Sequence, residues 1–295
     1  MHLSIHNWMR AEPIETTLAR ISRLGYESLE IQGAPQLYDL KKVKRQLADH
    51  GLKCWGSVTL MEDGLHLPSP DPAIRKRSVA YIKSLVDMVA ELEGYMVSVV
   101  PATVGKIVPD ARPEEEWAWA VEGMQEIYEY AVAAGIRIGI EPINRFETYF
   151  VNRAAQAYAL AEATGPECGV CLDIYHMNLE EADWEKALWD SADRLVGFHV
   201  ADNNRMAPGM GQLDWPKIIS VLKNIGYTGA VSAEFCPPLD RTPANPYPGS
   251  IDENPVGLSA EQKKFLEDHG SSAFTESFYT QLTKQSAEVL LPLLR

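Results

Sequence analysis

The sequence predicts an α/β protein made of eight β/α units that close into a (β/α)8 TIM barrel. Three observations lead to this fold class. Apolar runs of strand length alternate with segments of helical periodicity along almost the whole chain. The strands are continuously apolar rather than alternating, as in a parallel sheet covered on both faces. They number eight, which is the number that closes such a barrel.

The units follow one another in order. Residues 2–8 predict a short strand, and Pro13 begins a helix that ends at Gly25. The seven further strands are expected at 26–33, 52–60, 95–100, 136–142, 169–174, 195–200 and 229–235. Their helices are expected at 40–50, 73–92, 114–134, 153–164, 180–192, 215–225 and 274–294.

One segment breaks this rhythm. Residues 236–272 contain six prolines, too many for a regular element, between the last strand and the final helix. We expect one domain over residues 1–295, because barrels of this kind often exceed 200 residues as a single unit. A loop as long as 236–272 is typical of a lid or an interface, and a tolerated surface insertion is the alternative.

Composition excludes several classes of protein. Apolar residues make up 46% of the chain and charged residues 23%, as in ordinary globular proteins, and no apolar run approaches the roughly 20 residues of a membrane span. The first residues lack the basic region and apolar stretch of a secretory signal, so a cytoplasmic location is expected. The net charge of −14 argues against binding to nucleic acid.

Two cysteines lie in a C-x-x-C motif. Cys168 and Cys171 could form a redox or zinc motif, but the chain has no second such pair. We favour the interpretation that they fill a buried strand as small apolar side chains.

The ends of the last four strands carry ionisable residues. Glu141 follows an isoleucine-rich strand, and alone it could cap the next helix or pair with Arg145. Asp173, His199 and Glu234 hold matching positions, each about one β/α unit further on, so the four should converge at one rim of the barrel. Because the charged side chains of such a cluster would repel one another without a cation, we expect a bound divalent metal ion. The oxygen-rich set suits Mn²⁺, Mg²⁺ or Co²⁺ better than structural zinc.

Three motifs identify a family. The runs Glu141–Phe150 (EPINRFETYF), Leu172–Asn178 (LDIYHMN) and His199–Arg205 (HVADNNR) closely resemble the sugar isomerase/epimerase superfamily of xylose isomerase-like barrels. Within it, the ketose 3-epimerases of the D-tagatose and D-psicose type are the most similar. The β/α rhythm fits the whole chain, whereas the motifs cover residues 141–235.

The resemblance implies that Glu141, Asp173, His199 and Glu234 ligate one divalent metal, with Mn²⁺ favoured over Mg²⁺ and Co²⁺. The two glutamates would also carry the proton chemistry. One would remove the carbon-bound proton next to the ketone, giving a metal-held enediolate, and the other would return a proton from the opposite face.

Further positions correspond to residues that bind the sugar. By the same resemblance, Glu147, His176 and Arg205 would hold its carbonyl end. Glu147 could instead pair with Arg145, His176 could cap a helix start, and Arg205 could form a loop salt bridge. His6 and Trp8 follow the first strand, where the Trp8 ring could stack on a sugar or pack in the core. His66, in a loop that could cross the barrel mouth, is a weaker candidate, with a plain surface histidine as the alternative.

The proline-rich segment departs from the ketose epimerases. The chain is also similar to the large subunits of bacterial C-glycoside deglycosidases, which eliminate an aglycone from 3-oxo-glycosides and bind a small partner subunit. The expected substrate is therefore a keto-sugar or a 3-oxo-glycoside. The expected assembly is a homo-oligomer, or a hetero-oligomer with a small subunit if the chain is a deglycosidase.

Two hypotheses come from other classes. Endonuclease members of the same barrel superfamily cleave DNA with zinc ions, which requires many histidines and a basic groove, whereas this acidic chain has seven histidines. A non-enzymatic carbohydrate-binding barrel would not need two glutamates and a metal. Both hypotheses are weaker than a metal-dependent sugar enzyme.

Overall fold

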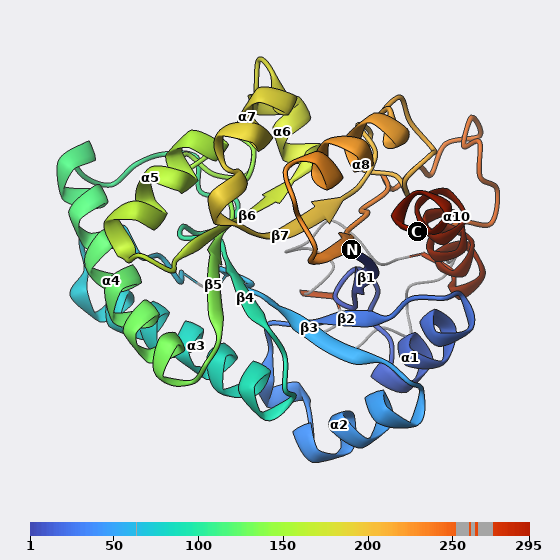
Figure 1. Cartoon of the computed structure of the whole chain (residues 1–295), viewed down its shortest axis with the longest axis horizontal. Helices are drawn as coiled ribbons and strands as arrows, with labels where there is room; N and C mark the ends of the chain where they lie inside the picture. Colours follow the sequence, from blue (N-terminus) through green and yellow to red (C-terminus); the bar gives the residue numbers. More distant parts are fainter. Residues whose placement is uncertain (63, 252–259, 261–262, 265–273) are drawn as a thin grey trace.

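Eight parallel strands form a closed barrel in the computed structural model, in the order β1 to β8 around the ring. The (β/α)8 fold class that the sequence predicts is confirmed. Figure 1 shows the helices as an outer layer around these strands. The structure describes residues 1–62, 64–251, 260, 263–264 and 274–295.

The strands are short and nearly all of their residues are buried. They are β1 (His2–His6), β2 (Ser28–Gln32), β3 (Lys53–Val58), β4 (Met96–Val99), β5 (Arg137–Ile140), β6 (Gly169–Asp173), β7 (Leu195–Val200) and β8 (Ala230–Ala233). Pairing of β1 with both β2 and β8 closes the ring. The register of β6 and β7 places Asp173 beside His199, and Val200 lies beside Ala233 on β8.

The helices cover the outside of the barrel. They are α1 (Ile14–Arg23), α2 (Leu40–Asp49), α3 (Pro72–Glu91), α4 (Pro113–Ala133), α5 (Ala154–Thr164), α6 (Ile174–Glu180), α7 (Trp184–Asp190), α8 (Trp215–Asn224) and α10 (Glu276–Leu294), with short 3₁₀ turns at Pro35–Leu37 and Ala192–Arg194. Aspartates cap several helix starts; for example, the Asp71 side chain accepts a hydrogen bond from the backbone N–H of Ala73. In the described part of the chain, no helix has the length and apolar character needed to cross a membrane.

One expected helix is wrong. Instead of a single helix over 180–192, the chain forms two short helices, α6 and α7. The Asp173 side chain accepts a hydrogen bond from the backbone N–H of Tyr175, so the chain turns helical directly at the end of β6. Glu181 is then extended and Asp183 caps the start of α7, which separates the two helices.

The thiols of the C-x-x-C motif are buried and free. Cys168 precedes β6 and Cys171 lies within it, and neither forms a disulfide. Cys168 packs in the hydrophobic core, as expected for a small apolar side chain, whereas the sulfur of the buried Cys171 lies 3.3 Å from Nε2 of His199.

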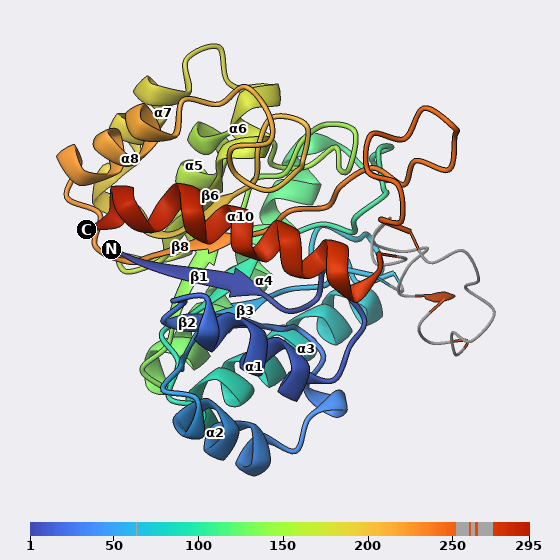
Figure 2. The ribbon, with the colours of Figure 1, turned by 90° about the vertical axis from the view of Figure 1, so that its right-hand side faces the viewer.

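The chain ends on the outside of the barrel, where α10 runs beside β1 and α8 (Figure 2). The Tyr26 hydroxyl donates a hydrogen bond to the carbonyl of Thr283, which ties α10 to the start of β2. Of the proline-rich segment 236–272, the expected lid or interface, residues 252–259, 261–262 and 265–272 lie outside the described part. Before them, Tyr247 packs on Phe278 with ring centroids 5.4 Å apart.

Replacing Leu282 by alanine should destabilise the protein by about 2 to 5 kcal/mol, because this fully buried side chain packs α10 into the core and its loss leaves a cavity. Leu37→Ala is the control, since Leu37 is largely exposed, and it should change stability by no more than about 0.5 kcal/mol. Urea unfolding of both variants measures the difference. Equal effects would show that α10 is not part of the cooperative core.

Candidate active site

Four ionisable side chains meet at the carboxyl ends of β5 to β8. Glu141 and Glu234 directly follow β5 and β8, whereas Asp173 ends β6 and His199 lies in β7. All four are buried, and their candidate ligand atoms all lie within 4.8 Å of one another. The convergence that strand spacing predicts is therefore present in the structure.

His199 lies at the centre of this cluster. Its Nδ1 atom is 2.9 Å from Oε1 of Glu141 and 3.5 Å from Oε2 of Glu234. The Ser98 hydroxyl donates to Oε2 of Glu141 at 2.6 Å, and Nε1 of Trp8 donates to Oε1 of Glu234 at 3.0 Å. Each glutamate is thus held on one oxygen and presents the other to the cluster.

Asp173 contributes an oxygen without a hydrogen bond. Its Oδ1 caps α6 through the N–H of Tyr175, while Oδ2 is buried and has no hydrogen-bond partner among the described residues. Burial, together with the Glu234 carboxylate, raises the pKa of Asp173 to about 7 although Arg205 opposes the shift. A buried carboxylate oxygen without a hydrogen bond, beside two further carboxylates and an imidazole, is an environment that a divalent cation would satisfy. The four side chains could therefore hold one metal ion.

Arg205 reaches the cluster from the loop between β7 and α8. It has a backbone φ of 59°, in the left-handed region that non-glycine residues seldom adopt. Its guanidinium nitrogens lie 3.9 to 4.0 Å from carboxylate oxygens of Glu147, Asp173 and Glu234, and its Cζ is 4.4 Å from the ring centroid of Tyr175. The strained backbone thus directs a cation toward the site carboxylates.

A buried carboxylate organises that loop. Asp202 accepts hydrogen bonds from the backbone N–H groups of Asn203, Gly209 and Leu213 and from Nε1 of Trp215, at 2.9 to 3.1 Å. A Cβ atom at Gly211 would come within 2.2 Å of Oδ1 of Asp202, so only glycine fits there. Asp202 therefore fixes the turn from which Arg205 extends.

His176 and Glu147 complete the wall. The backbone N–H of Asn144 donates to Nδ1 of His176 at 3.1 Å, and Nε2 of that ring is 3.1 Å from a guanidinium nitrogen of Arg205. Burial and the charge of Arg205 hold the pKa of His176 well below its ordinary value, so the ring is neutral. The Asn144 side-chain amide donates to Glu147 at 2.6 Å.

The structure decides several alternatives that the sequence leaves open. Arg145 pairs with Glu180 at 2.7 Å rather than with Glu141 or Glu147. The cap of α6 is Asp173, not His176. The salt-bridge partners near Arg205 are the site carboxylates themselves.

A cavity of about 320 Å³ opens above the cluster, a volume within the usual range for small-ligand sites. Its wall includes seven of the residues discussed above, namely Trp8, Glu141, Glu147, Tyr175, His176, Arg205 and Glu234. A second cavity of about 630 Å³ lies beside it, and Trp8 lines both. The candidate substrate residues therefore share one cavity, with the exception of His66.

His66 is neither at the surface nor in the cavity wall. It is 3% exposed, its Nδ1 accepts a hydrogen bond from the backbone N–H of Thr103, and its Nε2 is 3.2 Å from the Tyr149 hydroxyl. The sequence offers two interpretations of His66, a site residue or a surface histidine, and its position in the structure fits neither. It instead joins the loops after β3, β4 and β5.

Two of these loops are themselves paired. The backbone N–H of Gly105 donates to the carbonyl of Glu147 at 2.7 Å, and Lys106 and Thr148 form a parallel β-bridge. The loop after β4 therefore supports the segment that carries Glu147.

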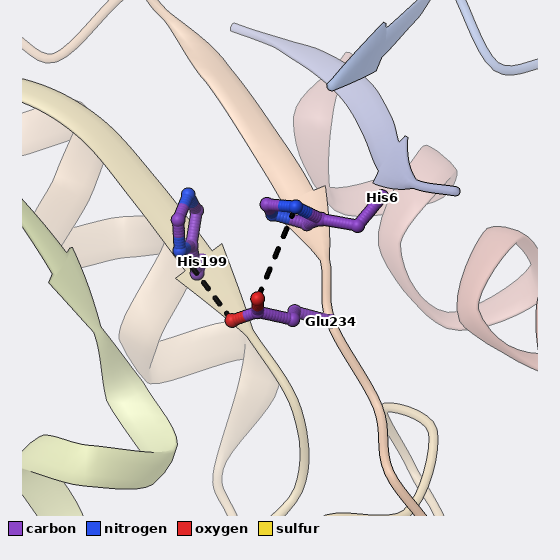
Figure 3. Close-up of side chains that lie close together, drawn as sticks. All are labelled: His6, His199 and Glu234. Atoms are coloured by element: carbon purple, nitrogen blue, oxygen red, sulfur yellow. Dashed lines mark ion pairs between the residues drawn. The ribbon is translucent and has the colours of Figure 1, made fainter. Parts of the chain in front are cut away.

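Sequence reasoning missed Glu30, which lies behind the cluster, and named His6 only as following the first strand. Glu30 on β2 is fully buried, with Oε2 3.3 Å from Nε2 of His199, and its other oxygen accepts a hydrogen bond from Ser232. His6 lies beside His199, and Figure 3 shows both rings facing Glu234; Nδ1 of His6 is 3.9 Å from Oε1 of Glu234. The one signal for Glu30 was an acid between two apolar residues, Leu29 and Ile31, in the middle of a predicted strand.

Comparisons with known proteins place the chain in a family. The family model described as "Xylose isomerase-like TIM barrel" matches residues 18–267. The chain belongs to this family. It is 30% identical to an L-ribulose 3-epimerase of Mesorhizobium japonicum over 75% of each chain. It is 27% identical to a 3-dehydro-D-guloside 4-epimerase of Escherichia coli over 72% of this chain and 84% of that protein.

Solved structures of the family share the fold. A crystal structure of D-psicose 3-epimerase from Clostridium cellulolyticum, described with D-tagatose, superposes with a TM-score of 0.81 at 22% identity, covering all of both chains. The similarity therefore extends over the complete barrel of this family member, including α10.

Asp202→Asn should lower stability by about 1.5 to 3 kcal/mol, because an amide has one acceptor oxygen where the carboxylate accepts four hydrogen bonds. Asp49→Asn, at the exposed end of α2, is the control and should have almost no effect. Chemical denaturation measures both. An unchanged midpoint for Asp202→Asn would mean that the loop does not depend on this carboxylate.

The free energy of unfolding should fall in mild acid, and His66 should contribute to this fall. Burial, together with the nearby charge of Lys106, lowers its pKa to about 4, so between roughly pH 6.5 and pH 4 the unfolded state binds a proton that the native state does not. Stability from this group is present above that window and is lost as the pH falls through it. His66→Gln should flatten this part of the curve of unfolding free energy against pH, and His50→Gln is the control. A slope unchanged by His66→Gln would contradict the assignment.

Proposed function

We propose that this chain is a divalent-metal-dependent ketose 3-epimerase, with Mn²⁺ the favoured ion and Mg²⁺ or Co²⁺ as alternatives. The observation that carries the proposal is the buried set of Glu141, Asp173, His199 and Glu234 beneath a sugar-sized cavity. Oδ2 of Asp173, which is buried and has no hydrogen-bond partner among the described residues, supports their assignment as metal ligands. Membership of the family, with relatives named as sugar epimerases, makes the chain an enzyme of the sugar isomerase and epimerase class.

Two glutamates are suited to proton transfer. Glu141 and Glu234 both line the cavity, and each has one oxygen fixed by a neutral donor, Ser98 or Trp8. One carboxylate would remove the proton from the carbon beside the ketone, and the other would return a proton to the opposite face, inverting that carbon. A bound divalent ion would polarise the ketone and the adjacent hydroxyl, which lowers the cost of removing that proton.

The remaining residues of the wall would bind and orient the sugar. Arg205 donates to sugar oxygens and to negative charge that develops on them, while Glu147 accepts a hydrogen bond from a hydroxyl. Neutral His176 offers a ring nitrogen at the same end of the cavity. Trp8 closes the other side with an aromatic face, a common surface against a sugar ring. His66 is not included, because it does not line the cavity.

A second candidate function uses the same residues on a larger substrate. The match to a 3-dehydro-D-guloside 4-epimerase and the cavity of about 630 Å³ beside Trp8 are the observations that support a 3-oxo-glycoside as substrate. With such a substrate, removal of a proton beside the ketone could end in epimerisation or in elimination of an aglycone. We keep this activity as the alternative.

We further propose the cellular setting expected from the sequence. The chain would act as one domain over residues 1–295, with 236–272 as a lid or interface insertion, in the cytoplasm and apart from nucleic acid. It would form a homo-oligomer, or bind a small subunit if it is a deglycosidase. The molecular mass in solution of the purified chain, alone and after coexpression with candidate partners, distinguishes a homo-oligomer from a complex with a small subunit.

Glu141→Gln and Glu234→Gln should each lower kcat by about 10²- to 10⁴-fold, because each removes a group that transfers a proton. Chelation of metal should abolish activity, and adding Mn²⁺ back should restore it. Glu162→Gln, an exposed substitution on α5, is the matched control and should keep wild-type activity. A metal-free double variant that remained active would exclude the mechanism.

The substrate is identified by parallel incubations in deuterated water with Mn²⁺. Deuterium at C3 of a free ketohexose supports the 3-epimerase, whereas inversion or aglycone release from a 3-oxo-glycoside supports the alternative. Failure of both classes of substrate, with and without partner subunits, would overturn the proposed function.

A further inference from the structure

Glu30 is a carboxylate buried in the barrel behind the four-residue cluster, and the proposed proton chemistry does not use it. It is fully inaccessible to solvent, in the middle of β2. One of its oxygens accepts a hydrogen bond from the Ser232 hydroxyl on β8. The other oxygen is 3.3 Å from Nε2 of His199 and 3.8 Å from Nε2 of His6. Burying an acid is costly, so contacts to three strands indicate a specific role.

The two nitrogens of His199 face different groups. Nδ1 points into the cluster, 2.9 Å from Glu141 and 3.5 Å from Glu234. Nε2 points the opposite way, toward Glu30. A neutral imidazole carries its proton on one nitrogen and a lone pair on the other, so only the tautomer protonated at Nε2 offers Nδ1 as a ligand.

A second atom competes for that proton. The sulfur of Cys171 is also 3.3 Å from Nε2 of His199. A thiol is a weak acceptor, whereas a carboxylate forms a charge-assisted hydrogen bond that is shorter and stronger. Of the two groups that face Nε2, Glu30 is therefore the stronger acceptor, and a cation that occupies the cluster would exclude a proton from Nδ1.

Glu30 is itself held in place. Ser232 fixes one oxygen, and the ring of His6 packs edge-on against the ring of His199 with centroids 4.5 Å apart. Because β1, β2, β7 and β8 each supply one of these groups, the orientation of the imidazole is defined by the barrel rather than by a loop.

We propose that Glu30 is a positioning residue for the metal site: it accepts the Nε2 proton of His199, so that the lone pair on Nδ1 is directed at the ion. The proposal rests on the proposed function, because the ion is part of that function. Removal of such a carboxylate partner typically weakens metal binding by about 10- to 100-fold.

Metal affinity tests the proposal without any substrate. We would compare Mn²⁺ binding to metal-free wild type, Glu30→Leu and Glu30→Gln by titration calorimetry, with Glu27→Gln, an exposed position just before the same strand, as the control. Glu30→Leu should bind Mn²⁺ about 10- to 100-fold more weakly, Glu30→Gln should lose less because its amide oxygen can still accept the proton, and the control should match wild type. Wild-type affinity in a folded Glu30→Leu variant would overturn the proposal. Absence of Mn²⁺ binding by wild type would overturn the proposed function and this proposal together.

The imidazole gives a second measurement if Glu30→Leu does not fold. In protein labelled with ¹⁵N at histidine and loaded with Mg²⁺, the Nε2–H signal of His199, assigned with His199→Asn, should be shifted downfield and slow to exchange. It should move upfield in Glu30→Gln. An ordinary signal that Glu30→Gln leaves unchanged would overturn the proposal, because a purely structural carboxylate would not affect that proton.

Discussion

Carboxylates lie close together inside the barrel, and the structure around them depends on balancing their negative charge. Three carboxylates and an imidazole occupy a volume in which their candidate ligand atoms all lie within 4.8 Å of one another, with almost no access to water. At such distances and in such surroundings, unbalanced negative charge is strongly unfavourable. The raised pKa of Asp173 is a direct expression of that constraint.

Hydrogen-bond donors and one cation around the cluster offset its negative charge. Neutral donors, Ser98 and Trp8, take one oxygen of each glutamate, and the Arg205 guanidinium approaches from above. Placing Arg205 there requires an unfavourable backbone conformation, which the buried Asp202 stabilises through its hydrogen bonds to the same loop. A site that concentrates charge therefore depends on neighbours held on strands and on one loop whose turn is fixed by the hydrogen bonds of Asp202.

The sequence was sufficient for the barrel and for the four-residue cluster because both follow from periodicity. Apolar strands repeat at regular intervals, and parallel strands bring their carboxyl ends to one rim, so Glu141, Asp173, His199 and Glu234 could be placed together. The two short helices after β6 were not predictable, because one aspartate acts both as a strand end and as a helix cap. Glu30 and the true place of His66 were missed because their partners are distant in sequence, and only the closed barrel brings them together.

The pairing of the loops after β4 and β5 bears on how this barrel could be altered. Since the backbone of Gly105 is hydrogen bonded to that of Glu147, and Lys106 bridges to Thr148, the two loops form one ribbon across the rim. Exchanging either loop alone with that of a relative would leave unmatched backbone groups beside the cavity. Loop grafts into this scaffold should therefore transfer residues 103–108 and 144–149 together, as a single cassette.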